Sequence, residues 1–150
     1  MPYFARVFSP SDAVPPLDSL RALAGQYAAT LTTADEEADW ETAELLYDEE
    51  EAPVDIERYL PATDGLFEED LNDIRATVEQ SEGPGVARVM GALEECRQIV
   101  AFRVPDDADD TVWGPLNAAM DAVTNTIGGI AHADAEGFYE GQDLILAMEQ

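Results

Sequence analysis

Two segments with the same layout open the two halves of this chain, and that repetition limits the fold more than any other feature. They are "PYFARVFSPSDAV", residues 2–14, and "QIVAFRVPDDADD", residues 98–110. Each joins an apolar run containing Arg-Val to a proline and an acidic loop, a pattern that predicts a strand followed by a turn. The chain therefore divides into two halves that begin alike.

Hydrophobic periodicity extends the two halves in a similar way. Apolar residues at helical spacing predict helices at 17–27 and 111–126, one after each opening strand. Shorter β-branched or alternating runs predict later strands, at 29–33, 40–47, 53–60, 128–135 and 143–148. Two similar strand-helix-strand-strand halves predict an α+β fold, with a mainly antiparallel sheet and helices on one face.

Two further helices are predicted between the halves. The first carries an apolar stripe at i, i+4, i+7 and i+11, with Thr63 or Asp64 available as its N-cap. That stripe consists of Phe67, Leu71, Ile74 and Val78. "SEGPG" ends this helix, and a second is predicted over 86–97, with Cys96 inward as a small buried hydrophobe. No long linker interrupts the 150 residues, so we expect a single domain over 1–150.

The charge of the chain is far from the usual range. Thirty-three acidic residues face seven basic ones, all arginine, and the formal net charge is -26. A small soluble domain commonly carries a net charge of magnitude about 2 to 8. A field of this sign repels nucleic acids and anionic membranes, because no basic patch can release phosphate counterions. We therefore expect no direct nucleic-acid binding and no membrane association.

Three explanations of this charge compete. The first is adaptation to a salty cytoplasm, where charges are screened over a Debye length of only ~3 Å at 1 M salt. The second is mimicry of a polyanion, and the third is a cation-binding surface. The acids are spread over the chain, with 19 in residues 1–75 and 14 in residues 76–150, which favours salt adaptation.

The densest acidic run lies between Asp35 and Glu57. It holds twelve carboxylates and no basic residue. A calcium loop of the EF-hand type needs a D-x-D-x-D-G rhythm and a closing glutamate at the twelfth position, and this run has neither. A solvated face or a pair of hairpin turns is the expected role of this run.

Motifs for catalysis and cofactor binding are absent from the sequence. It contains no G-x-S-x-G elbow, no P-loop and no G-x-G-x-x-G fingerprint after a strand. We expect no cofactor and, more broadly, no enzyme. The start "MPYFARVF" lacks the features of a signal peptide and no apolar run is long enough to cross a bilayer, so we expect a cytoplasmic protein.

The segment "IGGIAHADAEGFYEG", residues 127–141, contains the only histidine. If residues 130–136 are extended, His132, Asp134 and Glu136 project from one face and could hold a metal. The competing interpretation is structural: the alanines between them pack under a helix, while His132 and Asp134 interact on a wet face. H-x-D-x-E on one strand is not an established ligand spacing, which favours this second interpretation. "EGFYEG" is predicted to be a turn before the last strand.

Three segments resemble an uncharacterised family of small bacterial proteins. They are "MPYFARVFSPSDAVP", "IVAFRVPDDADD" and "GGIAHADAEGFYEGQDLIL". That family combines a "YYAR"-like first strand with a tail similar to "GG-I-Q-x-D-G-E-GFY". The resemblance covers nearly the whole chain but implies no activity, cofactor or substrate, so it assigns no functional residue. His132 and Ala135 stand where the family pattern has a glutamine-like residue and glycine, which implies that His132 is not a ligand shared by the family.

Three hypotheses about function follow. The first is a non-enzymatic acidic cytoplasmic protein that acts by binding another, unknown protein through a salt-adapted surface. The second is a polyanion mimic that occupies the DNA site of a nucleic-acid-binding protein. The third is a metal-dependent hydrolase or metal binder that uses His132, Asp134 and Glu136.

Overall fold

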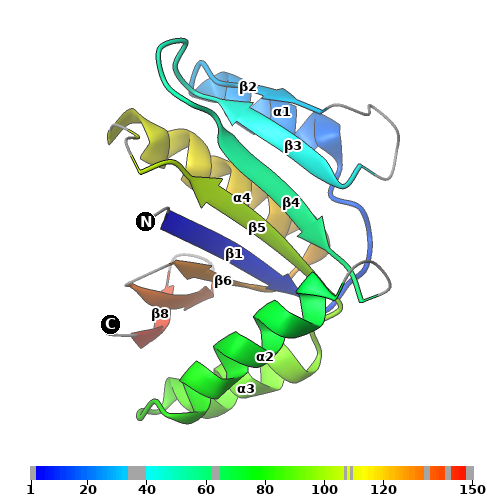
Figure 1. The fold of residues 1–150 in the computed structure, drawn as a ribbon, viewed down its shortest axis with the longest axis vertical. Helices are drawn as coiled ribbons and strands as arrows, with labels where there is room; N and C mark the ends of the chain where they lie inside the picture. The colour runs from blue at the N-terminus through cyan, green and yellow to red at the C-terminus, as the bar shows by residue number, and fades with distance from the viewer. Residues whose placement is uncertain are drawn as a thin grey trace.

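One antiparallel sheet organises the chain (Figure 1). The computed structural model describes residues 3–33, 40–61, 65–106, 108, 110–133, 136–140 and 143–147. Within these residues the strands are β1 Tyr3–Ser9, β2 Thr30–Thr32, β3 Thr42–Leu46, β4 Val54–Tyr59, β5 Gln98–Val104, β6 Ile130–Ala133, β7 Gly137–Glu140 and β8 Asp143–Ala147. The helices are α1 Leu17–Gln26, α2 Leu66–Glu79, α3 Gly85–Glu94 and α4 Trp113–Ile127, with a short 3₁₀ turn at Asp110–Val112 before α4. The predicted α+β class with an antiparallel sheet is confirmed.

The strand order in the sheet is β2-β3-β4-β5-β1-β6-β7-β8. The two similar opening strands, β1 and β5, pair with each other at its centre, with Tyr3 opposite Val104 and Ser9 opposite Gln98. A three-stranded meander flanks them on each side. As the chain proceeds, the first meander runs from the sheet edge at β2 to β4 beside the centre, whereas the second runs from β6 beside the centre to the edge at β8. The halves therefore share an order of elements but follow opposite paths across the sheet.

The prediction of a turn at residues 137–141 is wrong, because Gly137–Glu140 form strand β7 between β6 and β8. Gly137 makes this pairing possible. Its φ is 134°, and a Cβ added there would lie 2.1 Å from the carbonyl oxygen of Leu146 on β8. A residue that usually marks a turn here allows two backbones to approach closely.

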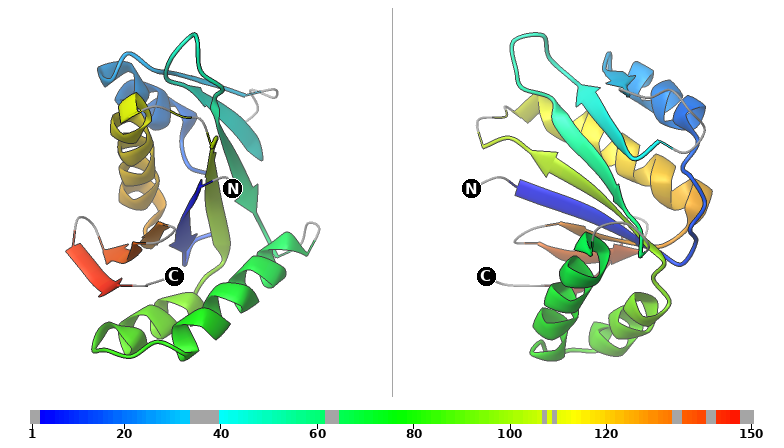
Figure 2. Two further views of the ribbon diagram at one scale, coloured as in Figure 1. Left: turned by 60° about the vertical axis from the view of Figure 1, so that its left-hand side comes forward. Right: turned by 45° about the vertical axis from the view of Figure 1, so that its right-hand side comes forward.

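The helices divide between the two faces of the sheet, which corrects the expectation of one face. Helices α1 and α4 pack against one face, here the α1–α4 face, where their side chains form a core with Val7, Val100 and Phe102. Helices α2 and α3 pack against the other, the α2–α3 face, around Phe8 and Ile99. Figure 2 shows α1 and α4 along one side of the sheet and α2 and α3 at its lower end. Both faces of the central strands are apolar, so both need cover.

Strand β4 forms in the alternating run predicted at 53–60, and its side chains alternate between a buried side, which includes its basic residue, and a more exposed side. Arg58 points inward and is buried. Its Nε donates to Oε1 of Gln98 at 2.8 Å, and its Nη1 donates to the carbonyl of Trp40 at 2.7 Å. The Gln98 amide in turn donates to the carbonyls of Ser11 and Ala13 at 2.8 and 2.7 Å. These bonds satisfy a buried cation and attach the loop after β1 to the sheet.

The middle helices follow their predicted stripes. In α2, Phe67 and Val78 are buried, and Leu71 and Ile74 pack partly buried against the same core. The predicted caps Thr63 and Asp64 lie outside the described residues, and Gly65 precedes the helix with a φ of 84°. Among the described residues, no helix has the length and apolar character to cross a membrane.

Candidate functional site

His132 lies inside the protein, which corrects the expectation that its side of the strand is wet. Its exposed fraction is 3%, and its ring centroid lies 4.7 Å from that of Phe138. Ile130 shares its side of β6 and belongs to the α2–α3 core. The prediction that the alanines pack under a helix agrees with Ala131, which packs against the α1–α4 core. His132 thus shares the face of β6 that carries Ile130, on the side of the sheet where α2 and α3 pack.

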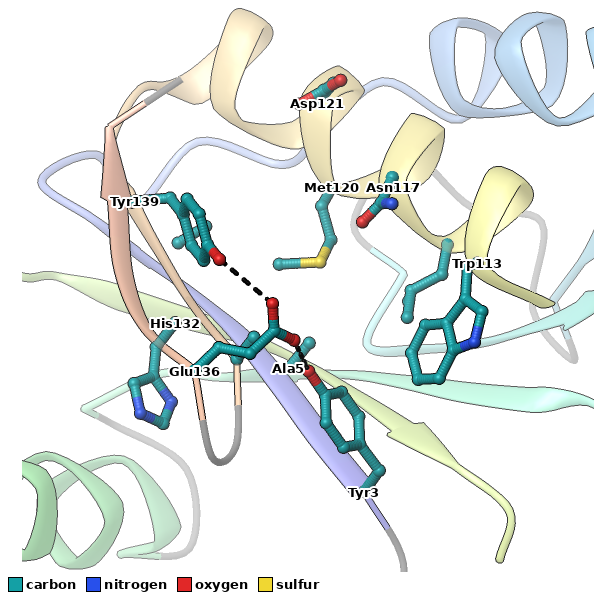
Figure 3. Close-up of a pocket in the computed structure, with 12 residues that line it drawn as sticks. Tyr3, Ala5, Trp113, Asn117, Met120, Asp121, His132, Glu136 and Tyr139 are labelled. Carbon is teal, nitrogen blue, oxygen red and sulfur yellow. Dashed lines mark hydrogen bonds between the residues drawn. The ribbon is translucent and has the colours of Figure 1, made fainter. Parts of the chain in front are cut away.

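The proposed metal triad does not assemble in the described residues. Strand β6 ends at Ala133, and Glu136 occupies the following turn, where its amide donates to the Ala133 carbonyl at 3.1 Å. Figure 3 shows the His132 ring pointing away from a pocket into which the Glu136 carboxylate projects. Asp134 lies outside the described residues. In the part of the chain that the structure describes, no group of three His, Cys, Asp or Glu side chains could hold a metal ion.

Cys96 is buried, as predicted. Its thiol donates to the Gln98 carbonyl at 3.3 Å, and burial raises its pKa to about 11. A thiol with this pKa stays protonated near neutral pH and is a poor nucleophile. The burial and the pKa agree with a structural role for Cys96.

A pocket of about 550 Å³ opens between α4 and strands β1, β6 and β7 on the α1–α4 face. Its volume falls in the range of small-ligand sites, roughly 300–1,000 Å³. Leu116, Met120, Ala131 and Ala133 supply apolar lining, and Asn117 and Asp121 add polar groups from α4. Tyr3 and Trp113 meet at one end with ring centroids 5.2 Å apart, edge to face.

Glu136 is held in place at this pocket by two phenols (Figure 3). The Tyr3 hydroxyl donates to Oε2 at 2.6 Å, and the Tyr139 hydroxyl donates to Oε1 at 3.0 Å. The bond to Glu136 raises the pKa of Tyr139, so this phenol keeps its proton at neutral pH. Burial raises the pKa of Asp121 on the facing helix. A carboxylate that already accepts hydrogen bonds from two phenols suits binding better than proton abstraction.

The sequence pattern singled out Glu136 but missed its partners. Tyr139 follows three residues later, so its proximity was the one local signal. Tyr3 comes near because β1 pairs with β6, with Ala5 opposite Ala133, and its end therefore lies beside the turn after β6. Trp113 is the first residue of α4. Only the register and the helix docking bring these residues together.

A second candidate surface lies on the α2–α3 face of β3 and β4, beyond the cover of the two helices. Figure 1 shows no described helix in front of these strands. Glu44 and Asp55 lie directly opposite each other, and Asp55 also lies opposite Arg103, with 3.7 Å between carboxylate and guanidinium. Glu57 is exposed on the same face, and burial together with this carboxylate raises the pKa of Tyr59 to about 12.

We call this surface the open acidic face and define it by five residues of β3 and β4: Thr42, Glu44, Leu46, Asp55 and Glu57. Its three carboxylates are the acids of the Asp35–Glu57 run that lie on described strands. The first acids of the run, Asp35 to Asp39, lie outside the described residues. Of the two expected roles of this run, the hairpin turn agrees with the strands that flank Asp48–Glu51, and the solvated face agrees with the exposure of Glu44 and Glu57.

The chain matches no family model, no curated protein sequence and no solved structure. The resemblance to a bacterial family therefore stays a prediction.

Proposed function

We propose that this protein is not an enzyme and acts by binding a basic segment of another protein at the open acidic face. The observation that carries the proposal is a set of outward carboxylates on β3 and β4 without a covering helix in the described residues. Charge complementarity attracts basic partners and speeds association. Leu46, 39% exposed on the same face, offers an apolar contact beside the charges.

The pair Glu44 and Asp55 supports a role beyond folding. Side chains directly opposite on antiparallel strands lie about 4.5–5.5 Å apart, and like charges there reduce stability. Asp55 has one arginine near it, whereas the register gives Glu44 an acid opposite. A basic partner would relieve this repulsion on binding.

The salt-adapted surface belongs to the same proposal. A net charge of -26 opposes folding by self-repulsion, and salt screens it. The free energy of unfolding, followed by circular dichroism, should therefore rise between about 0.05 and 3 M KCl. A flat or falling dependence would contradict the adaptation.

Affinity isolation from the native lysate tests the binding surface, at about 0.1 M and 1 M salt. Three chains are compared: the unchanged protein, a face variant with Glu44→Gln, Asp55→Asn and Glu57→Gln, and a matched variant with Glu68→Gln, Glu79→Gln and Glu94→Gln. Both variants lose three charges, but the matched one loses them from exposed positions on α2 and α3. A basic protein retained by the first and third chains and lost from the second supports the proposal. Equal retention by all three chains contradicts it.

A further inference from the structure

The pocket around Glu136 has the chemistry of a cation site on a different face of the molecule from the open acidic face. Its described lining contains the carboxylates of Glu136 and Asp121. The one basic side chain in that lining is His132, whose ring points away from the pocket. A cation that enters meets acceptors and meets no like charge in the described lining.

Aromatic rings add a second, independent preference for a cation. Tyr3, Trp113 and Tyr139 line the pocket, and the edge-to-face contact of Tyr3 with Trp113 holds both rings in place. Ring faces attract ammonium groups, and Trp does so most strongly. Trp113 is 38% exposed, so its ring is accessible to a ligand.

The geometry at Glu136 favours a ligand that donates hydrogen bonds. A carboxylate offers about four lone-pair positions, and the two phenols use one on each oxygen. The remaining positions can accept from N–H groups, and the fixed carboxylate loses little freedom when they do. Leu116, Met120 and Ala131 add apolar lining to the same pocket, without N–H donors in their side chains.

We propose that this pocket binds an alkylammonium group, with the nitrogen at the Glu136 carboxylate and the alkyl chain along Leu116, Met120 and Ala131. A free amine and a lysine side chain both present this group. The site is independent of the open acidic face, because the two lie on opposite faces of the sheet.

Titration calorimetry with defined probes tests the site. We expect n-butylammonium to bind with a dissociation constant of about 1 mM or below, and 1-butanol and butyrate to give no saturable heat. Trimethylbutylammonium lacks N–H donors and should bind more weakly than n-butylammonium. N-acetyl-lysine N-methylamide represents a protein side chain, and tighter binding of this probe would support a protein source for the group. The proposal would be overturned if neither n-butylammonium nor N-acetyl-lysine N-methylamide saturated the protein below about 10 mM, or if 1-butanol bound as well as n-butylammonium.

Substitutions locate the binding. Glu136→Gln should weaken n-butylammonium about tenfold or more, because it removes the charge that accepts the N–H bonds. Trp113→Leu should weaken it about three- to fivefold through loss of the ring face. Glu94→Gln removes one charge from an exposed position on α3, outside both proposed sites, and should leave the affinity unchanged.

Tyr3→Phe and Tyr139→Phe keep the rings and remove the hydroxyls that orient Glu136. Each should weaken n-butylammonium several-fold while circular dichroism shows a folded protein. These two variants keep the test valid if Glu136→Gln fails to fold. Equal affinity in the Glu136→Gln and Glu94→Gln chains would show that general charge attraction holds the amine, which is incompatible with the proposed site.

Discussion

The two meanders that flank the central strands differ in what their α2–α3 face presents. On β6–β8 this face carries Ile130, His132, Phe138 and Leu146, and all four are buried. On β3 and β4 the same face carries Thr42, Glu44, Leu46, Asp55 and Glu57, of which all but the half-buried Asp55 are exposed. Two similar strand patterns thus serve different purposes, one as core and one as surface.

The difference follows from where α2 and α3 dock. Side chains of these helices enclose Phe8, Ile99 and Ile130 at one end of the sheet. They leave β3 and β4 open, so carboxylates there remain hydrated at little cost. Burial of the same groups without partners would cost several kcal/mol. The location of the helix pair therefore decides which meander is buried and which stays exposed.

The largest expected effect tests the covered meander. Phe138 is fully buried, and Phe138→Ala should reduce the free energy of unfolding by about 3–5 kcal/mol through lost burial and a cavity. Urea denaturation at neutral pH measures this change. Leu46→Ala on the open meander is the control, with an expected change within about 0.5 kcal/mol. Similar losses in both variants would remove the distinction between the meanders.

Gly137 tests the close pairing of β7 with β8. Gly137→Ala places a Cβ against the Leu146 carbonyl at a φ of 134°, and should cost roughly 3 kcal/mol. Gly65 also has a positive φ, 84°, but nothing lies within 4 Å of its added Cβ. Gly65→Ala should therefore cost about 1 kcal/mol, from backbone strain alone. Equal thermal stability of the two variants would argue against the close approach.

Tyr59 marks the boundary between open and covered regions on β4. Its pKa is raised from 10.0 to about 12, so the folded state resists ionisation that the unfolded state undergoes. This contribution is present below pH 10 and is lost as the pH rises toward 12. Two pKa units correspond to about 2.7 kcal/mol, which solvent screening of this half-buried group reduces to about 1 kcal/mol.

Tyr59→Phe should accordingly lower the alkaline loss of stability between pH 9.5 and 11 by about 1 kcal/mol. Urea denaturation at each pH gives the slope, and the same pair of proteins at pH 7 is the control. An unchanged slope in the variant would place the phenol in open solvent.

The smallest effect concerns the carboxylates of the open meander. Glu44→Gln removes the like-charge contact with Asp55 and should raise the free energy of unfolding by about 0.2–1 kcal/mol at 0.05 M KCl. The gain should vanish at 3 M KCl, where the Debye length falls below about 3 Å. Glu94→Gln on α3 also removes one negative charge and should raise the free energy of unfolding by a smaller amount. A larger gain from Glu94→Gln would show that only net charge matters.

Local patterns predicted the regular elements well. The alternating run at 53–60 predicts a strand, and β4 forms there with Val54, Ile56 and Arg58 on one side. The helix predicted at 111–126 is α4, which ends at Ile127 before Gly128 at a φ of 77°. These features depend on neighbours in the chain, which a sequence displays directly.

The errors come from long-range packing. "EGFYEG" has the composition of a turn, but Gly137–Glu140 within it pair with both β6 and β8 and form β7. His132 has a polar side chain beside acidic residues, but the docking of α2 and α3 covers it. The pocket unites Tyr3, Trp113 and Glu136, which are far apart in the chain and meet through the β1–β6 register and the position of α4.

The sequence by itself determined the α+β class, the order of most elements, the inward and outward faces of β4 and the acidic character of the surface. Hydrophobic periodicity and charge are properties of short segments, so no fold is needed to recognise them. Only the tertiary structure decided which meander is covered and which acids gather with aromatic rings. Those outcomes depend on where helices dock and how strands pair, because burial and proximity are set by contacts between distant segments.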